Sequence, residues 1–360
     1  MMNKIIENQL IDELTAQFRR SPMQMNKLHG SDAELIQLSG DPNMRLAITT
    51  DSIVEEIAVG LYDDPYLVGW MAVMANMSDL AAVGARPIGI LLSEVLPHDF
   101  PAASLQQLQQ GIHDACVTCG TFVLGGDTAM SDQLMLTGTA AGIIDGKNIL
   151  TRNGCKPGDL VYVSGPVGRG NAFALSILFS NSAPDSRFGS GVLRYQPIAR
   201  LSIGQSLLGI ASACMDTSDG VLSSLDQLMR LNGVGFELDG SWEDAVDSES
   251  RELASINGIS PWLLLAGQHG EFELLFTVEA DREDDLREAA SKGGWTPLLL
   301  GRAIVKPEIY LPMCGGRVAI DTALIRNLAQ HAESNIQRYV RELLALDQEF
   351  RKGDVHYVNQ

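Results

Sequence analysis

The sequence predicts a mixed α/β (α+β) protein that is divided into two domains. Short apolar runs of strand length alternate with stretches whose apolar residues recur at helical spacing, in both halves of the chain. The length of 360 residues suffices for two ordinary domains. The turn-rich stretch TRNGCKPGD at 151–159 is the predicted boundary. We therefore expect an N-terminal domain at 1–150, a C-terminal α/β domain at 151–322 and a helical extension at 323–360.

In the first half, the best-marked element is a long helix that begins after residue 64. Asp64 can cap this helix, Pro65 suits its first turn, and Gly84 with Pro87 ends it. Apolar periodicity also predicts a helix over roughly the first 28 residues. The other predictions are a helix at 105–119 and strands at 46–50, 88–96, 122–124 and 134–144.

The second half also mixes strands and helices. Its predicted strands lie at 160–164, 234–238, 271–278, 298–304 and 308–311. Its predicted helices lie at 169–180, 197–212 and 222–231, with a further helical pattern at 323–350.

Charge and hydropathy exclude several classes of partner. The formal net charge of −19 would repel nucleic acid and anionic membranes, so neither is expected as a partner. No stretch approaches the roughly 18 consecutive apolar residues of a membrane-spanning helix, and the N-terminus does not resemble a signal peptide. The five cysteines are an odd number, which favours reduced thiols over disulfides. We expect a soluble, cytoplasmic protein.

Five aspartates lie at the ends of predicted strands or on helices. A buried carboxylate without a partner is unfavourable, and lysine and arginine are scarce beside these positions. Bound divalent cations are the natural compensation, and oxygen ligands favour Mg²⁺ or Mn²⁺. The five are Asp51, Asp79, Asp127, Asp216 and Asp219.

Each motif also has a purely structural interpretation. Asn76 and Asp79 share one face of an apolar helix, which suits a ligand or ion but also a satisfied structural pair. Ser218 or Asp219 can serve as a helix N-cap and nothing more. A second acid at Asp216 is less easily explained by capping alone.

Each candidate phosphate-binding residue, taken singly, also has a purely structural interpretation. Gly126 next to Asp127 allows the backbone to approach a phosphate, yet the same tetrapeptide is compatible with an ordinary turn. Arg152 can bind phosphate oxygens or be a surface charge. The chain contains no Walker A sequence, no H-E-x-x-H zinc motif and no G-x-S-x-G nucleophile motif.

Taken in order, the motifs resemble the thiamine-monophosphate kinase family. They are LAITTD followed by VE, then MANMSDLAAVGARP, LGGDT, LTRNGCKPGDLVYVSGPVG and MDTSDGVLSSL. The resemblance implies a two-domain aminoimidazole ribonucleotide synthetase-like fold, in which the N-terminal domain binds ATP and Mg²⁺ and forms a β-barrel across a homodimer. It also implies that ATP, bound through several Mg²⁺ ions, reacts with a small-molecule acceptor.

The resemblance assigns roles to individual positions. The implied ATP contacts are Gly126, Asp127, Arg152 and Ser218. The implied metal ligands are Asp32, Thr49, Thr50, Asp51, Asp79, Asp127, Asp216 and Asp219.

This chain departs from the family pattern mainly at the acceptor positions. One acid of a Gly-Asp-Asp motif is replaced by Ser31, and Ala58 stands where the family carries an acceptor-contacting histidine. The family's acceptor-contacting glutamate aligns with Gly270, or with Glu271 if a gap is allowed. The extension after residue 323 has no evident counterpart in the family.

Two functions are compatible with this pattern. The first is an Mg²⁺-dependent ATP phosphotransferase that resembles thiamine-monophosphate kinase, with an acceptor that can differ. Phosphoryl transfer needs positioning and charge neutralisation more than covalent chemistry, so no protein nucleophile is expected. The second is a non-catalytic or regulatory nucleotide-binding homologue of such a kinase.

Overall fold

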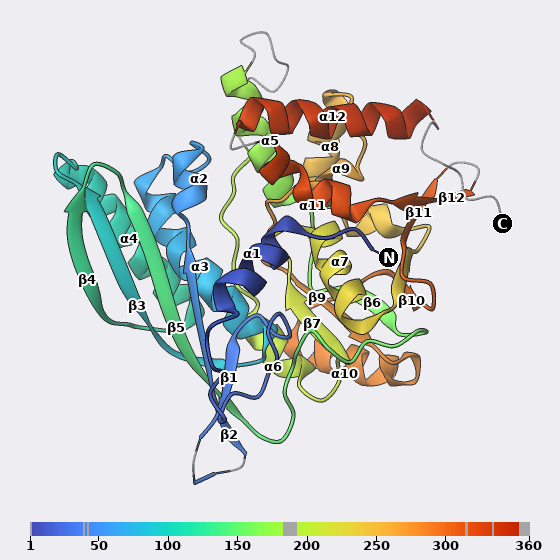
Figure 1. The fold of residues 1–360 in the computed structure, drawn as a ribbon, viewed down its shortest axis with the longest axis horizontal. Helices are drawn as coiled ribbons and strands as arrows, with labels where there is room; N and C mark the ends of the chain where they lie inside the picture. Colours follow the sequence, from blue (N-terminus) through green and yellow to red (C-terminus); the bar gives the residue numbers. More distant parts are fainter. Residues whose placement is uncertain are drawn as a thin grey trace.

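Two open β-sheets organise the computed structural model of the chain, which describes residues 2–38, 40–41, 43–182, 193–313, 316–332 and 335–352 (Figure 1). The first sheet has the strand order β1-β2-β5-β3-β4, with β3 and β4 parallel and the other pairs antiparallel. Its strands are β1 (Glu34–Gln37), β2 (Met44–Ser52), β3 (Arg86–Pro97), β4 (Val123–Ser131) and β5 (Met135–Asp145).

The second sheet has the strand order β12-β11-β8-β10-β6-β9-β7. The mixed α/β class predicted from the sequence is therefore confirmed, whereas the short edge strands β1, β7 and β12 were not predicted. The strands are β6 (Leu160–Val163), β7 (Ala213–Asp216), β8 (Gly235–Leu238), β9 (Leu274–Val278), β10 (Leu298–Ile304), β11 (Ile309–Met313) and β12 (Gly316–Ile320).

Helices lie around both sheets. The predicted N-terminal helix is shorter than expected, and the extension after residue 323 contains two helices instead of one pattern. None of the helices in the described ranges is long and apolar enough to cross a membrane. The helices are α1 (Ile6–Thr15), α2 (Val54–Ala58), α3 (Pro65–Ala82), α4 (Ala102–Cys119), α5 (Arg169–Ser182), α6 (Leu201–Leu207), α7 (Val221–Asn232), α8 (Ser248–Ile256), α9 (Leu263–Ala266), α10 (Glu283–Gly293), α11 (Thr322–His331) and α12 (Ile336–Lys352), with 3₁₀ turns η1 (Trp242–Ala245) and η2 (Ala280–Arg282).

Helix α3 joins the two halves of the molecule. It packs against α4 and the first sheet on one side and against α6 and β7 of the second half on the other. The Asp64 side chain accepts a hydrogen bond from the backbone N–H of Tyr66, which confirms the predicted cap. A helix that is apolar on nearly all sides is buried on nearly all sides, and this position makes α3 the fixed element between the two sheets.

The contact between α3 and α4 depends on two glycines. A Cβ atom at Gly69 would lie 2.1 Å from the carbonyl oxygen of Leu108. A Cβ atom at Gly111 would lie 2.0 Å from the carbonyl oxygen of Tyr66. The two helix backbones therefore approach each other more closely than any side chain permits.

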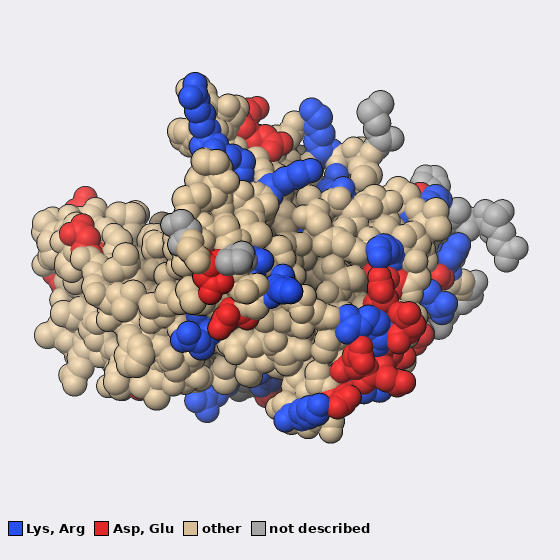
Figure 2. Space-filling view, turned by 90° about the horizontal axis from the view of Figure 1, so that it is seen from below, with Lys and Arg blue, Asp and Glu red and all other residues tan. Residues whose placement is uncertain are grey.

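One face of the first sheet is covered by α3 and α4, and the other face is open, at the left of Figure 1. The open side exposes apolar side chains of β3 and β4, and Leu124 retains 54% of its accessible surface. Seen from below, this end of the molecule also carries few charged side chains (Figure 2). The exposed apolar residues on these two strands are Ile88, Leu91, Val123, Leu124 and Met130.

We predict that Gly111→Ala destabilises the protein, because the added methyl group forces α3 and α4 apart. Overpacking of this kind lowers the free energy of unfolding by about 1–3 kcal/mol or more. Urea denaturation followed by circular dichroism measures the change. Gly240→Ala is the control, since nothing lies within 4 Å of a Cβ at that position, and equal stability of the two variants would contradict the close-packing account.

Candidate metal–nucleotide site and acceptor pocket

Three aspartates from distant parts of the sequence meet between the two halves. Asp32 precedes β1, Asp79 lies near the end of α3, and Asp216 is the last residue of β7. One carboxylate oxygen from each lies within 4.8 Å of the other two. Asp216 is almost completely buried, with 2% of its surface exposed. The structure therefore brings together three of the aspartates that the sequence marked as metal ligands.

Arg152 is the cation that contacts this acidic group. Its Nη2 atom lies 2.9 Å from Oδ1 of Asp32. Burial alone would lower the pKa of Arg152, but the adjacent charge of Asp32, followed by those of Asp79 and Asp216, raises it. The other oxygen of Asp32, Oδ2, is buried and has no hydrogen-bond partner among the described residues. One guanidinium thus leaves a buried carboxylate oxygen without a donor.

Mutual repulsion follows from this arrangement. Burial, followed by the charges of Asp51 and Asp216, raises the pKa of Asp79 well above the ordinary value. Burial, with the charge of Asp32 next, raises the pKa of Asp216 to about 7. Such shifts are expected when like charges share a site of low dielectric constant. The donor set is all oxygen and includes an unpartnered buried atom, so the residues present fit Mg²⁺.

Residues of β2 extend the acidic group along the first sheet. The Thr49 hydroxyl donates a hydrogen bond to Oδ2 of Asp79. The backbone N–H of Asp51 donates to Oδ1 of Asn76, 3.1 Å away. Burial is the main reason that the pKa of Asp51 is raised. Asn76 therefore anchors β2 against α3, and both predicted residues, Thr49 and Asp51, lie beside Asp79.

The Asp216 carboxylate is held by two serines. Oδ2 accepts a hydrogen bond from the Ser78 hydroxyl at 2.6 Å, and Oδ1 accepts one from the Ser218 hydroxyl at 2.9 Å. Asp219 follows at the exposed start of α7. Sequence reasoning missed Ser78, whose only signal was its place beside Asp79 in an apolar helix.

Three predicted site residues lie elsewhere in the single chain. The Thr50 hydroxyl donates to the carbonyl oxygen of Gly138 at 2.7 Å, away from Asp79. Asp127 is exposed on the edge strand β4, and the strand register places its side chain on the open face of the sheet. Gly126 permits close pairing of β4 with β3, because a Cβ there would lie 1.8 Å from the carbonyl oxygen of Leu92. Their roles in binding stay predictions.

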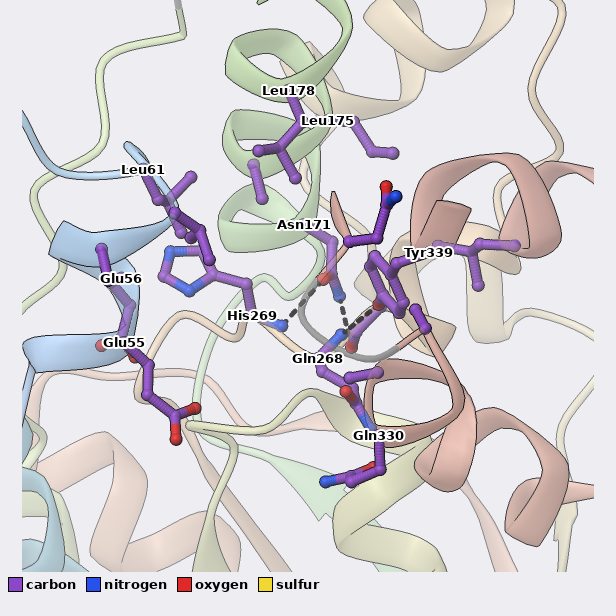
Figure 3. A pocket seen from close by; sticks show the side chains of 18 of the residues that line it. Glu55, Glu56, Leu61, Asn171, Leu175, Leu178, Gln268, His269, Gln330 and Tyr339 are labelled. Atoms are coloured by element: carbon purple, nitrogen blue, oxygen red, sulfur yellow. Dashed lines mark hydrogen bonds between the residues drawn. The ribbon is translucent and has the colours of Figure 1, made fainter. Parts of the chain in front are cut away.

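A cavity of about 620 Å³ lies between α2, α5 and the helices α11 and α12 (Figure 3). Ala58 lines this cavity, as do Gln268 and His269, the two residues before Gly270. Glu271 does not line it. Its Oε2 atom accepts a hydrogen bond from the backbone N–H of Gly168 at 2.7 Å, and burial raises its pKa to about 8. We call this cavity the acceptor pocket.

The loop that carries Gln268 and His269 is fixed on both sides. The Tyr339 hydroxyl accepts a hydrogen bond from the backbone N–H of Gln268 at 3.3 Å, so the C-terminal extension holds the loop from the pocket side. His269 Nε2 lies 3.1 Å from the Tyr62 hydroxyl, and burial lowers the pKa of His269 to about 4. The imidazole is therefore neutral at physiological pH.

The same loop contacts the acidic motif on its other side. The backbone N–H of Gly270 donates to the carbonyl oxygen of Ser218 at 2.8 Å. A Cβ at Gly270 would lie 1.5 Å from the carbonyl oxygen of Thr217, so only glycine fits. The acceptor pocket and the Asp216–Asp219 segment are thereby placed next to each other.

We predict that Asp79→Asn stabilises the metal-free protein at neutral pH and abolishes stabilisation by Mg²⁺. A raised folded-state pKa favours the folded state at low pH, and that stability is lost as the pH rises through the folded pKa. For Asp216, the pH range of this loss runs from the ordinary pKa of 3.8 to the folded-state pKa of about 7. The free energy of unfolding decreases over this range by on the order of 4 kcal/mol at most. Asp79→Asn removes one carboxylate from the acidic group, so the protein loses less stability as the pH rises.

Thermal unfolding at pH 5 and pH 7.5, with and without Mg²⁺, measures both effects. Asp63→Asn is the control, because Asp63 is exposed after α2 and outside the acidic group. A Tm increase with Mg²⁺ that is as large in Asp79→Asn as in the wild type would show that these acids do not hold the ion.

Comparison with known proteins supports one family. Residues 30–144 match the family described as AIR synthase related protein, N-terminal domain. The chain is 31% identical over 268 residues to thiamine-monophosphate kinase of Haemophilus influenzae, covering 71% of this chain and 76% of that relative. It is 29% identical over 286 residues to thiamine-monophosphate kinase of Pyrococcus abyssi, covering 79% of this chain and 86% of the relative.

Solved structures share the fold. The structure of AaThiL complexed with AMPPCP and TMP has a TM-score of 0.67 at 23% identity, covering 84% of this chain and 90% of that chain. HypE of E. coli, a hydrogenase maturation protein, has a TM-score of 0.64 at 22% identity, covering 87% of this chain and 96% of that chain. Because the sequence relatives match over most of their length, the chain belongs to the thiamine-monophosphate kinase family of ATP-dependent kinases.

Proposed function

We propose that this chain transfers the γ-phosphoryl group of ATP to a small acceptor in an Mg²⁺-dependent reaction, with thiamine monophosphate as the first acceptor to test. The observation that carries the proposal is the hydrogen bond from the Gly270 backbone N–H to the Ser218 carbonyl oxygen, which supports it by linking the loop that lines a cavity of ligand size to the segment that carries Asp216. Phosphoryl transfer requires this juxtaposition of a charge-neutralising site and an acceptor site.

The acids provide the ligands for the metal ions. Asp32, Asp79 and Asp216 form the centre of the ligand set, with Thr49 and Asp51 beside them. Bound Mg²⁺ supplies neutralisation of the triphosphate charge and orients its oxygens. We assign Asp219 to the same ligand set.

Arg152 and Ser218 are the proposed ATP contacts on this side of the site. Arg152 already carries a persistent positive charge beside Asp32. Ser218 orients the Asp216 carboxylate through its hydroxyl and holds the acceptor loop through its carbonyl oxygen. The reaction needs no protein nucleophile, because an acceptor phosphate oxygen is already anionic and attacks the γ-phosphorus directly.

We further propose that two chains associate through the open faces of their five-stranded sheets and thereby form a barrel. The exposed apolar side chains of β3 and β4, such as Leu91 and Leu124, support this association, because large exposed apolar patches mark interfaces. Thr50 and Asp127 lie on the same open face, and we assign them, with Gly126, to the site at the junction of the two chains. We also propose that the domains end at residues 150 and 322 and that the protein is located in the cytoplasm.

A non-catalytic nucleotide-binding protein is the second candidate. It is favoured by Ser31 in place of an acid and by Ala58 in place of a histidine. This alternative predicts that Mg²⁺–ATP binds but that no acceptor is phosphorylated. The two candidates therefore differ in product formation and not in nucleotide affinity.

We predict Mg²⁺-dependent formation of ADP and thiamine diphosphate from ATP and thiamine monophosphate. Asp127→Asn should weaken the affinity for Mg²⁺–AMPPCP by about 10-fold or more if Asp127 is a ligand, while circular dichroism shows an unchanged fold. Coupled assay of ADP and calorimetry measure the two quantities. Binding without any product would favour the non-catalytic alternative, and a misfolded variant whose native fraction binds normally would assign Asp127 a structural role.

We predict that Leu124→Lys converts a dimer into a monomer, because a lysine charge on the open face opposes burial against a second sheet. Sedimentation equilibrium measures the mass of each species. Val117→Lys is the control, since Val117 is 65% exposed and belongs to α4, a helix on the covered side of the sheet. A wild type that is monomeric at micromolar concentration, or a variant that remains dimeric, contradicts the proposed barrel.

A further inference from the structure

None of the described residues that line the acceptor pocket has a cationic side chain. Its charged lining residues are Glu55 and Glu56, and the remaining lining residues are apolar or neutral, including His269. Among the described residues, an anionic group inside the pocket would meet two carboxylates and no counter-charge. The part of the acceptor that enters the pocket is therefore neutral or cationic, and any phosphate of the acceptor must remain outside, toward the acids.

The position of α2 supports this orientation. Helix α2 begins three residues after Asp51, so the wall that carries Glu56 continues directly from the strand that carries part of the acidic group. The opposite wall is formed by α11 and α12, where Tyr339 holds Gln268. Figure 3 shows Glu56 and Tyr339 on opposite sides of the pocket, with His269 between them.

Glu56 has an unusual feature among these lining residues. Its Oε2 atom is buried and has no hydrogen-bond partner among the residues that the structure describes. Burial, opposed by the residue's own backbone N–H, raises the pKa of Glu56, which is expected where no cation is close. A buried oxygen atom that could accept a hydrogen bond but has no donor destabilises the fold. A hydrogen-bond donor supplied by a ligand is the natural compensation.

We propose that Glu56 selects the acceptor by accepting a hydrogen bond from an N–H group, or by pairing with a cationic nitrogen, on the part of the acceptor that occupies the pocket. This inference rests on the proposed phosphotransferase function. Ala58, two residues along the same helix, leaves space on this wall, because its side chain is a single methyl group. Specificity then comes from Glu56 and the shape of the pocket, whereas the metal–nucleotide group supplies the reaction.

A pair of probes and a pair of variants test this inference. The probes are thiamine monophosphate and its analogue in which the amino group of the pyrimidine ring is replaced by oxygen. The variants are Glu56→Gln, which keeps the size of the side chain, and Asp63→Asn, which removes a nearby exposed charge outside the pocket. Steady-state kinetics give KM and kcat for each probe, and calorimetry gives the affinity for Mg²⁺–AMPPCP.

The expected result is a rise in the KM of Glu56→Gln for thiamine monophosphate of about 10-fold or more, as for loss of a hydrogen bond to a charged group. The kcat and the affinity for Mg²⁺–AMPPCP should stay unchanged. Wild type and Asp63→Asn should prefer thiamine monophosphate over the analogue, and Glu56→Gln should lose this preference, because the two changes remove the same contact.

The outcomes separate the inference from the proposed function. Kinetics of Glu56→Gln that equal those of the wild type with both probes overturn the role of Glu56 and leave the phosphotransferase proposal intact. A wild type that binds Mg²⁺–AMPPCP but makes no product from either probe overturns the proposed reaction, and the inference with it. If Glu56→Gln lowers the affinity for Mg²⁺–AMPPCP, Glu56 contributes to nucleotide binding, and its proposed role in selecting the phosphoryl acceptor is overturned.

Discussion

The close approach of Asp32, Asp79 and Asp216 is the constraint on which the rest of the structure depends. Three carboxylates with oxygens within 4.8 Å repel one another in the absence of a cation, and Arg152 contacts only one of them directly. The fold must therefore supply enough packing energy elsewhere to hold the group together. Helix α3 does so, because it is buried against both halves of the molecule and fixes the position of Asp79.

Several parts of this arrangement follow from local sequence alone. The cap at Asp64 and the strand Leu298–Ile304 require only a capping residue or an apolar run between turns, and both predictions are confirmed. The acids Asp79 and Asp216 stand out because a carboxylate in an apolar helix or strand needs a partner. The strands β1, β7 and β12 were missed, since short edge strands carry too few residues for a periodic signal.

Other features need the three-dimensional structure. Thr50 and Asp51 are adjacent in sequence, yet alternation along a strand sends their side chains to opposite faces. Which of the two faces α3 depends on strand register, which the sequence motif does not contain. Whether the family's acceptor-contacting glutamate corresponds to Gly270 or to Glu271 was open for a similar reason. The structure places Gln268 and His269 in the pocket and turns Glu271 toward Gly168.

The loop between the two sites explains how the acceptor positions can differ while the acids stay in place. Its inner side is constrained, because Gly270 lies against Thr217 and Ser218 without room for a side chain. Its outer side faces the pocket, where the side chains of Gln268 and His269 contact residues other than the acids, such as Tyr62. Changes on the outer side therefore alter the shape and polarity of the acceptor pocket without moving the Asp216 segment. For the proposed phosphotransferase, this division separates acceptor specificity, on the outer side of the loop, from the acidic group on its inner side.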